Sequence, residues 1–311
     1  LTEVIDATLH LIEEDEATTK DLMQYIKGPD FPTGGVMFGQ ADLEHAYATG
    51  RGGVTVRGEA EIVEQKTGVA QIIITSIPYR VNKSDLISSI ATLVSEKKLE
   101  GIKGLRDEST KDIRVAIDLK TGVHPQKVLN YLYKHTQLEQ MFHFNMVALV
   151  KGVPQTLSLK SMLEEFVAHR QEVVRRRTEY DLRRAKEREH ILLGLKKALD
   201  HIDRVISIIR ASKDSAVAKL NLMKEFKFSE LQTIAILEMR LQKLAGLERK
   251  AVEEELKAKQ AFIKECEILL ASEKKILGVI ASELKDIKEK YGDDRRTRVV
   301  KGGVQQISEE D

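Results

Sequence analysis

A proline-free stretch from Leu159 to Ile209, with one glycine at Gly194, constrains this chain most. Its later apolar residues are three and four positions apart, the heptad spacing that lines one face of a long helix. They are Leu192, Leu195, Leu199, Ile202, Ile206 and Ile209. A second seam is formed by Leu256, Ile263, Leu270, Leu277 and Leu284, with Ile280 and Ile287 at alternate positions. Although Lys259 and Glu273 interrupt the second seam, the two together predict an antiparallel helical arm that goes out and returns.

The segment between the two seams predicts an apolar tip. Ser229 and Gln232 have the spacing of a capping box, which starts a helix. A local helical cap could bury the apolar stripe that follows, and so could a second copy of the chain. We favour self-association, because an apolar patch left in water is an aggregation hazard. The predicted interface is Leu231, Ile234, Leu237, Met239, Leu241 and Leu244, with Ile236 on the same flank as Met239.

The first half of the chain predicts a mixed domain. Residues 1–27 have helical periodicity, and a glycine- and proline-rich breaker follows at 28–35. Alternating apolar residues predict one strand over 54–62, which a turn at 66–68 joins to a strand at 72–74. The remaining predicted elements are a helix capped by Asn82, a strand at 113–119, a short helix at 128–132 and a strand at 145–150. The predicted fold is therefore an α+β domain over 28–158 followed by the helical arm, mainly α overall.

Composition excludes several classes of protein. Lys and Arg number 50 against 49 Asp and Glu, so the net charge of +1 names no partner, and any nucleic-acid site requires a local patch. One cysteine, Cys266, rules out an intrachain disulfide framework and fits a reducing cytoplasm. No apolar run approaches the ~20 residues of a membrane span, so no membrane partner is expected. Leu1 in place of Met indicates a piece cut from a longer protein.

Motifs for catalysis and metal binding are missing from the sequence. The eight histidines show no metal-ligand spacing, and acidic runs such as Glu253–Glu255 are typical of solvated helix faces. The glycine-rich run Gly50–Gly53 leads into a predicted strand, whereas a phosphate loop leads into a helix. We therefore predict no catalytic residue, no metal site and no bound cofactor in this chain.

Two groups of basic residues remain. The first surrounds the turn at Ile77–Lys83 and consists of Arg51, Arg57, Arg80, Lys83 and Arg106. Such cations can hold DNA phosphates without reading the base sequence, and ordinary surface charge explains them equally well. The second group lies in the outgoing helix and consists of Arg170, Arg175, Arg176, Arg177, Arg183, Arg184 and Arg188. Acidic residues are interleaved with it, so we interpret most of this group as i,i+4 ion pairs within the helix.

A series of motifs occurs in a fixed order along the whole chain. They are GPDFPT at 28–33, YATGRG at 47–52, IPYRVNK at 77–83, LRDES at 105–109, NMVAL at 145–149, RRT at 176–178 and YGDDRRT at 291–297. Together they closely resemble the A subunits of bacterial type IIA DNA topoisomerases. YKHTQL at 133–138 followed by NMVAL looks more like the gyrase type than the topoisomerase IV type.

The resemblance implies a division of the chain. Residues 1–27 would connect from a winged-helix domain, and 28–158 would form the tower domain that flanks the gate DNA. Residues 159–291 would form the coiled-coil arm, with the exit-gate tip, or C-gate, at about 212–250. Residues 292–311 would lead to a DNA-wrapping β-pinwheel.

The resemblance also implies partners and an activity. In such enzymes a homodimer cleaves one DNA duplex with a pair of tyrosines and passes a second duplex through the break. The gyrase B subunit, joined to the A subunit in an A2B2 complex, hydrolyses ATP with Mg. The cleaving tyrosine of the family follows an Arg and precedes a Thr, and no tyrosine of this chain follows an Arg. We therefore predict that this chain binds double-stranded DNA and itself but does not cleave DNA.

Two alternatives stay open. A fragment of a topoisomerase IV A subunit would have the same architecture. A purely structural coiled-coil dimerisation module would explain residues 159–290 but leaves the motifs of 28–158 without a reason.

Overall fold

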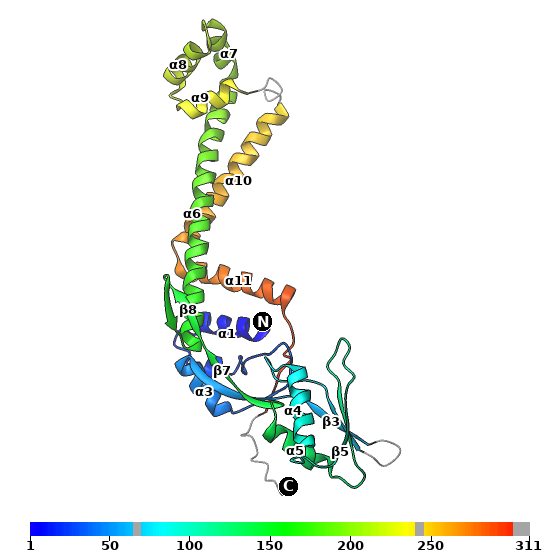
Figure 1. Ribbon diagram of the computed structural model, residues 1–311. Helices are drawn as coiled ribbons and strands as arrows, with labels where there is room; N and C mark the ends of the chain where they lie inside the picture. The colour runs from blue at the N-terminus through cyan, green and yellow to red at the C-terminus, as the bar shows by residue number, and fades with distance from the viewer. Residues whose placement is uncertain (65–69, 240–245, 301–311) are drawn as a thin grey trace. The chain divides into compact units, whose positions relative to one another are not determined.

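The computed structural model describes residues 1–64, 70–239 and 246–300. The chain forms two compact units (Figure 1). Among the described residues, the first unit comprises Leu1–Val167 together with Leu284–Val300, and the second comprises Ala168–Glu283. The second unit is therefore an insertion in the chain of the first.

The first unit contains two four-stranded sheets and a hairpin. Its helices are α1 (Thr2–Glu13), α2 (Thr19–Leu22), α3 (Gln40–Thr49), α4 (Lys83–Ser95) and α5 (Pro125–His135). Its strands are β1 (Val36–Phe38), β2 (Arg51–Arg57), β3 (Ala60–Glu64), β4 (Ala70–Ile74), β5 (Ile102–Asp107), β6 (Val115–Leu119), β7 (Glu139–Asn145), β8 (Val147–Val150), β9 (Val153–Thr156) and β10 (Arg298–Val299).

The first sheet has the strand order β10-β1-β2-β7. Strands β2 and β7 pair antiparallel over their whole lengths, from Arg51 opposite Asn145 to Arg57 opposite Glu139. Strand β10 pairs parallel with β1, although the two are far apart in the sequence. The core beside this sheet includes Leu22, Met37, Leu43, Val54 and Val56. The predicted helix over 1–27 is wrong in its middle, because α1 ends at Glu13 and α2 begins only at Thr19.

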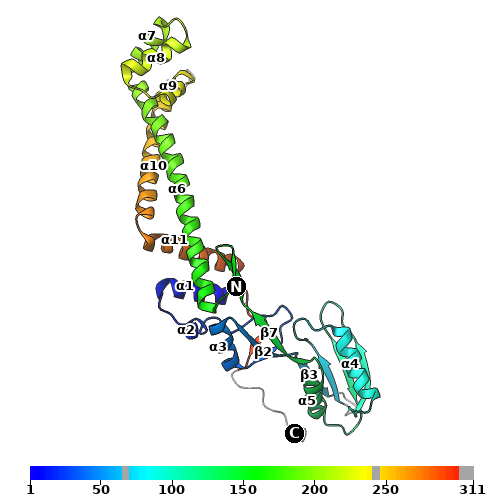
Figure 2. The same ribbon diagram turned by 60° about the vertical axis from the view of Figure 1, so that its left-hand side comes forward.

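The second sheet has the strand order β3-β4-β6-β5, with α4 and α5 packed beside it (Figure 2). Its apolar core includes Ile72, Ile74, Ile117, Leu119 and Leu132. Asn82 caps α4 as predicted, since its Oδ1 accepts a hydrogen bond of 2.8 Å from the amide of Ser84. The α+β character predicted for this part of the chain is confirmed.

The predicted single strand over 54–62 is wrong. It is two strands that belong to different sheets, β2 in the first and β3 in the second. The chain changes sheet at Gly58, where a Cβ atom would lie 2.4 Å from the carbonyl oxygen of Ser76. Only glycine permits that close backbone approach. The apolar alternation continues across the crossing, so the alternation alone could not reveal it.

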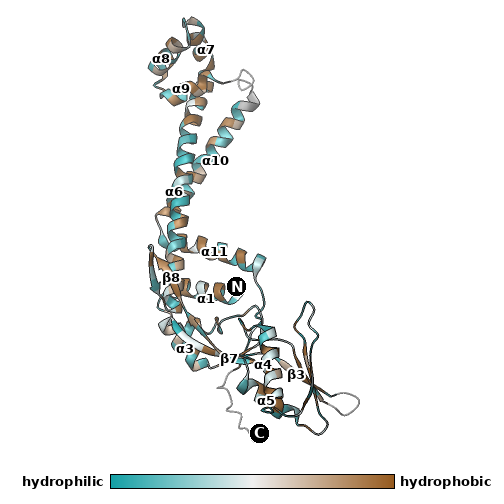
Figure 3. Cartoon of the chain, in the orientation of Figure 1, coloured by the Kyte–Doolittle hydropathy of each residue, from teal (hydrophilic) through white to brown (hydrophobic). Residues whose placement is uncertain are grey.

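The second unit is helical. Helix α6 (Leu159–Asp200) enters it from the first unit, and α11 (Glu273–Tyr291) leads back. Between them lie α7 (Ile202–Ala211), α8 (Ser215–Phe226), α9 (Glu230–Leu237) and α10 (Gly246–Leu270). Ion pairs join Arg188 of α6 to Glu255 of α10, and Asp200 of α6 to Arg249 of α10. Residue numbers therefore decrease along α10 in the direction in which they increase along α6. The two helices therefore run antiparallel, as predicted, and their middle parts are mostly hydrophilic (Figure 3).

The predicted seams hold only within single helices. Leu192, Leu195 and Leu199 are buried, but α6 ends at Asp200. In the next helix Val205 is buried in the core, whereas the predicted Ile202 and Ile206 are only half-buried. On the return, Leu256 and Ile263 are buried.

A second break lies between α10 and α11. Beyond it Ile276 and Ile280 are buried, whereas the predicted Leu277 is half-buried and Ile287 is exposed. Each break rotates the apolar face, so a heptad count carried across it is wrong.

Candidate functional site

Arg51 and Arg80 are exposed and have no carboxylate partner among the described residues. The guanidinium of Arg51 donates to the side-chain oxygens of Asn145 and Thr156, each at 3.2 Å. Arg80 follows β4 in a left-handed turn with φ of 70°, and its guanidinium lies 5.6 Å from the ring centroid of Phe142. A charge held against a ring but exposed to water can still meet a phosphate oxygen.

Arg57 is held inside the first sheet. Its Nε donates to Glu139 on the neighbouring strand at 2.5 Å, and only 16% of its side chain is exposed. The guanidinium is also stacked between Phe38 and Tyr133, at 4.8 and 4.3 Å from their ring centroids. Its charge is thus neutralised and largely covered, which leaves little of it for a ligand.

Lys83 and Arg106 meet acidic residues around β5. Lys83 lies 2.7 Å from Asp107, and this ion pair together with hydrogen bonds from Ser109 lowers the pKa of Asp107 to about 2. Arg106 pairs with both Asp118 and Glu108. The structure therefore brings these two predicted cations to the same strand, but each has an acidic neighbour.

Two motifs from opposite ends of the chain meet in a clasp. The contact between the loop Gly28–Thr33 and the segment Asp293–Val299 is called the clasp. The carboxylate of Asp30 accepts from the amides of Arg296 and Thr297, at 3.0 and 2.8 Å. The hydroxyl of Thr297 accepts from the amide of Phe31 at 2.8 Å.

Arg295 is the centre of the clasp. Its guanidinium makes two hydrogen bonds to Glu3, at 2.7 and 2.5 Å, and donates to the carbonyl oxygens of Gly28 and Pro29. Burial by itself raises the pKa of Glu3, but the hydrogen bonds from Arg295 and from the amide of Lys27 outweigh it and hold that pKa below its ordinary value. Both charged groups are therefore fixed in their ionised forms.

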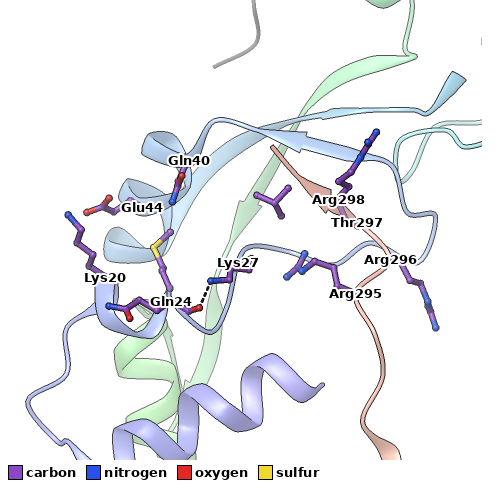
Figure 4. Close-up of a pocket in the computed structure, with 11 residues that line it drawn as sticks. Lys20, Gln24, Lys27, Gln40, Glu44, Arg295, Arg296, Thr297 and Arg298 are labelled. Atoms are coloured by element: carbon purple, nitrogen blue, oxygen red, sulfur yellow. Dashed lines mark hydrogen bonds between the residues drawn. The ribbon is translucent and has the colours of Figure 1, made fainter. Parts of the chain in front are cut away.

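A cavity of about 910 Å³ lies beside the clasp (Figure 4). It is lined by Lys20, Met23, Gln24, Lys27, Gln40, Glu44, Arg295, Arg296, Thr297, Arg298 and Val299. Sequence reasoning missed this basic cavity. The paired arginines of the YGDDRRT motif were a signal, but nothing in the sequence placed them beside α2.

The tip of the second unit has a core of its own. It includes Leu192, Val205, Leu222, Phe228 and Ile236, and part of the predicted stripe packs against it. Helix α9 approaches α6 closely at Gly194, where a Cβ atom would lie 2.6 Å from Cγ of Gln232. The capping box of Ser229 and Gln232 is confirmed.

The predicted interface residues divide into three groups. Leu231 and Ile234 are exposed, at 65% and 36%. Leu237 and Met239 are partly buried against the tip core. Leu241 and Leu244 lie outside the described residues. Ile236, predicted to be on a flank, is buried at 3%.

Helix α8 adds exposed apolar residues that the sequence reasoning missed. Leu220 is 65% exposed and Val217 is 36% exposed. An ion pair of 2.5 Å between Lys219 and Glu230 joins α8 to α9 next to Leu220 and Leu231. The apolar residues at i and i+3 on α8 were the available signal.

Three of the seven arginines named in α6 pair with acidic residues of other helices. Arg170 and Arg177 both bind Glu283, at 2.6 and 2.7 Å, and Arg188 makes a two-fold contact with Glu255. In the part of the chain that the structure describes, Arg176 and Arg184 are the two members of the group that pair within α6. The interpretation of most of this group as i,i+4 pairs is therefore wrong. Carboxylates of α10 and α11 lie within ion-pair distance of Arg170, Arg177 and Arg188.

The described part of the chain has neither a metal-binding cluster nor a membrane-spanning helix. No group of three His, Cys, Asp or Glu side chains there could hold a metal ion. None of the helices described is long and apolar enough to cross a membrane.

Comparisons with known proteins agree with one another. The family of the DNA gyrase/topoisomerase IV A subunit matches residues 1–285. The DNA gyrase A subunit of Clostridium acetobutylicum is 50% identical over 96% of this chain and 36% of its own length. The DNA gyrase A subunits of Staphylococcus epidermidis and Staphylococcus aureus are each 45% identical over 100% of this chain and 35% of their own lengths.

The chain thus spans about a third of the length of the curated relatives it matches. The match to the Staphylococcus epidermidis subunit extends over both units of the chain. This chain belongs to the family of DNA gyrase and topoisomerase IV A subunits.

Proposed function

We propose that this chain is part of the A subunit of a DNA gyrase. The parent enzyme would be a cytoplasmic type IIA topoisomerase that supercoils DNA negatively by passing one duplex through a break in another. The observation that carries the proposal is the 50% identity to a DNA gyrase A subunit over 96% of the chain. ATP and Mg would be used by the gyrase B subunit in an A2B2 complex.

Within that enzyme the two units would do different mechanical work. Residues 28–158 would be the tower beside the gate DNA, reached through the connector 1–27. Residues 159–291 would be the coiled-coil arm with its exit-gate tip at about 212–250, and 292–311 would lead to the next domain. The antiparallel pairing of α6 with α10 supports the arm assignment.

The DNA contact is proposed to depend most on Arg80. Arg80 is exposed and lacks a carboxylate partner in the described parts of the chain, and its guanidinium lies 5.6 Å from the ring centroid of Phe142. Arg51 would assist, because its hydrogen-bond partners are neutral. Arg57, Lys83 and Arg106 would contribute less, since acidic residues already neutralise them.

Duplex affinity measured against salt concentration tests this. Arg80→Glu should reduce the slope of log affinity against log salt by about 0.9 for each lost phosphate contact. Lys111→Glu, a charge reversal at an exposed lysine of the same unit, is the matched control. Equal slopes for the Arg80 variant and the unmodified chain would refute the role of Arg80.

The exit-gate contact is proposed to use the exposed apolar residues of α8 and α9. Leu231 and Leu220 are each 65% exposed, outside the apolar core of the tip. A gate must open, so a modest apolar contact between two copies suits it better than an extensive permanent one.

Sedimentation of the chain tests self-association through the tip. Leu220→Asp with Leu231→Asp should turn dimers into monomers without unfolding the tip, because both side chains are exposed. Ile268→Asp introduces the same charge at an exposed apolar residue of α10 and should leave the dimer intact. Dimers that persist in the double variant would exclude this surface.

DNA cleavage is proposed to require parts of the enzyme other than this chain. None of its seven tyrosines follows an Arg, as the cleaving tyrosine of the family does. Incubation with supercoiled plasmid, the gyrase B subunit and Mg should yield no covalent protein–DNA adduct, and an adduct mapped to any of these tyrosines would overturn the proposal. The same plasmid assays on the parent enzyme distinguish gyrase from topoisomerase IV, because only a gyrase introduces negative supercoils.

A further inference from the structure

The basic cavity beside the clasp has no role in the function proposed so far. It lies between α2, the first turns of α3 and the segment Arg295–Val299 (Figure 4). Five of its lining residues are cationic, and only Glu44 is acidic. An excess of like charges around one hollow is unfavourable in the empty protein and favours an anionic ligand.

Three of these cations have no carboxylate in ion-pair contact among the described residues. Arg295 binds Glu3, and Arg298 lies 3.2 Å from Glu59. By contrast, Lys20 and Arg296 form no ion pair within the described residues, and the ammonium of Lys27 donates only to the neutral carbonyl of Gln24. The described structure therefore leaves Lys20, Lys27 and Arg296 without an opposing carboxylate in contact.

The backbone that carries these cations is fixed although their side chains are exposed. The amide of Arg296 donates to Asp30 at 3.0 Å, and the amide of Lys27 donates to Glu3 at 3.2 Å. These hydrogen bonds thus fix the backbone positions of Lys27 and Arg296 before any ligand arrives. Such preorganisation reduces the entropy lost on binding.

The directions of the side chains favour an extended ligand. Figure 4 shows Lys27 and Arg295 on one side of the segment 295–299, whereas Arg296 and Arg298 are directed to its other side. This is the alternation of an extended strand. A compact anion would reach one side only. A polyanion that crosses the segment would meet both, and a DNA backbone carries such charges at regular intervals.

We propose that this cavity and the adjoining side of the segment bind phosphate groups of a DNA duplex, at a contact separate from that of Arg80. The inference rests on the proposed function, because it takes DNA as the polyanion. Lys20, Lys27 and Arg296 supply the charge, and the amides of Gln24 and Gln40 are further donors at the same surface.

The test compares two variants of the whole chain that lose the same charge. Lys20→Gln with Arg296→Gln should reduce the affinity for a short duplex about tenfold at low salt, and the salt slope by roughly 1.8. Lys111→Gln with Lys120→Gln removes two exposed lysines elsewhere in the unit and should change neither quantity. Inorganic tripolyphosphate, added as a competitor to both proteins, forms the second arm.

Each result supports or overturns the proposal. If Arg80→Glu weakens duplex binding and the cavity variant does not, this inference fails while the proposed function stands. If the unmodified chain binds no duplex at all, both fail together. If tripolyphosphate binding depends on Lys20 and Arg296 but duplex binding does not, the cavity is a site for small phosphate compounds and the DNA assignment is wrong.

Discussion

One ion pair taken from each unit shows how far the surroundings of a charge differ within this chain. In the first unit only 18% of the Arg295 side chain is exposed, and its partners include two backbone carbonyls. In the second unit the side chains of Arg188 and Glu255 are 44% and 39% exposed. Water screens an exposed pair, so it contributes little, whereas removing half of a covered pair leaves an unpaired charge. We therefore expect charge to stabilise the clasp of the first unit, and apolar burial to stabilise the tip of the second unit more than the Arg188 pair does.

The largest effect expected from this difference is at the clasp. Arg295→Ala should destabilise the first unit by about 3 kcal/mol, because Glu3 and two carbonyls lose their donor. Hydrogen exchange of the β1 and β10 amides measures it. Arg296→Ala, at the exposed neighbouring residue, should leave the exchange rates of these amides unchanged. Equal exchange rates in the two variants would show that the covered ion pair of Arg295 does not stabilise the clasp.

The next effect should come from the tip core. Ile236→Ala removes a buried side chain and should lower the free energy of unfolding of the second unit by about 2–4 kcal/mol. Leu231→Ala, five positions earlier on the same helix but exposed, should change it by less than about 0.5 kcal/mol. Thermal unfolding followed by circular dichroism compares the two variants. A larger destabilisation by Leu231→Ala than by Ile236→Ala would contradict the buried position of Ile236 and the exposed position of Leu231.

A smaller effect is expected for the exposed pair between α6 and α10. Arg188→Ala should destabilise the second unit by at most about 1 kcal/mol, because solvent screens the charges. A double-mutant cycle with Glu255→Ala isolates the interaction itself. A coupling several times larger would mean that charge, too, fixes the arm.

The smallest effect should appear only in acid. The pKa of Asp107 is lowered to about 2 by Lys83 and Ser109, so its stabilising contribution is complete above the ordinary carboxyl pKa. That contribution is lost as the pH falls from about 4 through 2. Carboxyl NMR should give a midpoint near 2, and Lys83→Gln should raise it. An unchanged midpoint in the variant would assign the shift to Ser109 alone.

Sequence patterns predicted the second unit better than the first. The heptad spacing found α6 and α10 because their contacts follow from local periodicity. It failed at His201 and again after Leu270, where a helix break rotates the apolar face. In the first unit the sheet crossing at Gly58 depends on a contact with Ser76, which no local pattern contains.

The candidate sites followed the same division. The residue type and the turn identified Arg80 from sequence, but the neutralisation of Arg57 by Glu139 arises from the β2–β7 register. The basic cavity joins residues near 20 and near 296, and this pairing exists only in the folded chain. The local sequence showed which residues are charged. It could not show which residues they pair with.

The parallel pairing of β1 with β10 has a consequence for the order of folding. Phe31 and Thr297, which bond to each other in the clasp, are 266 residues apart in the sequence. At roughly 5–20 residues per second of synthesis, β1 would wait on the order of 15–50 s for its partner. The whole of the inserted helical unit emerges in that interval and can fold from local contacts, which form fast. We therefore expect the first unit, although it begins the chain, to be the last to close.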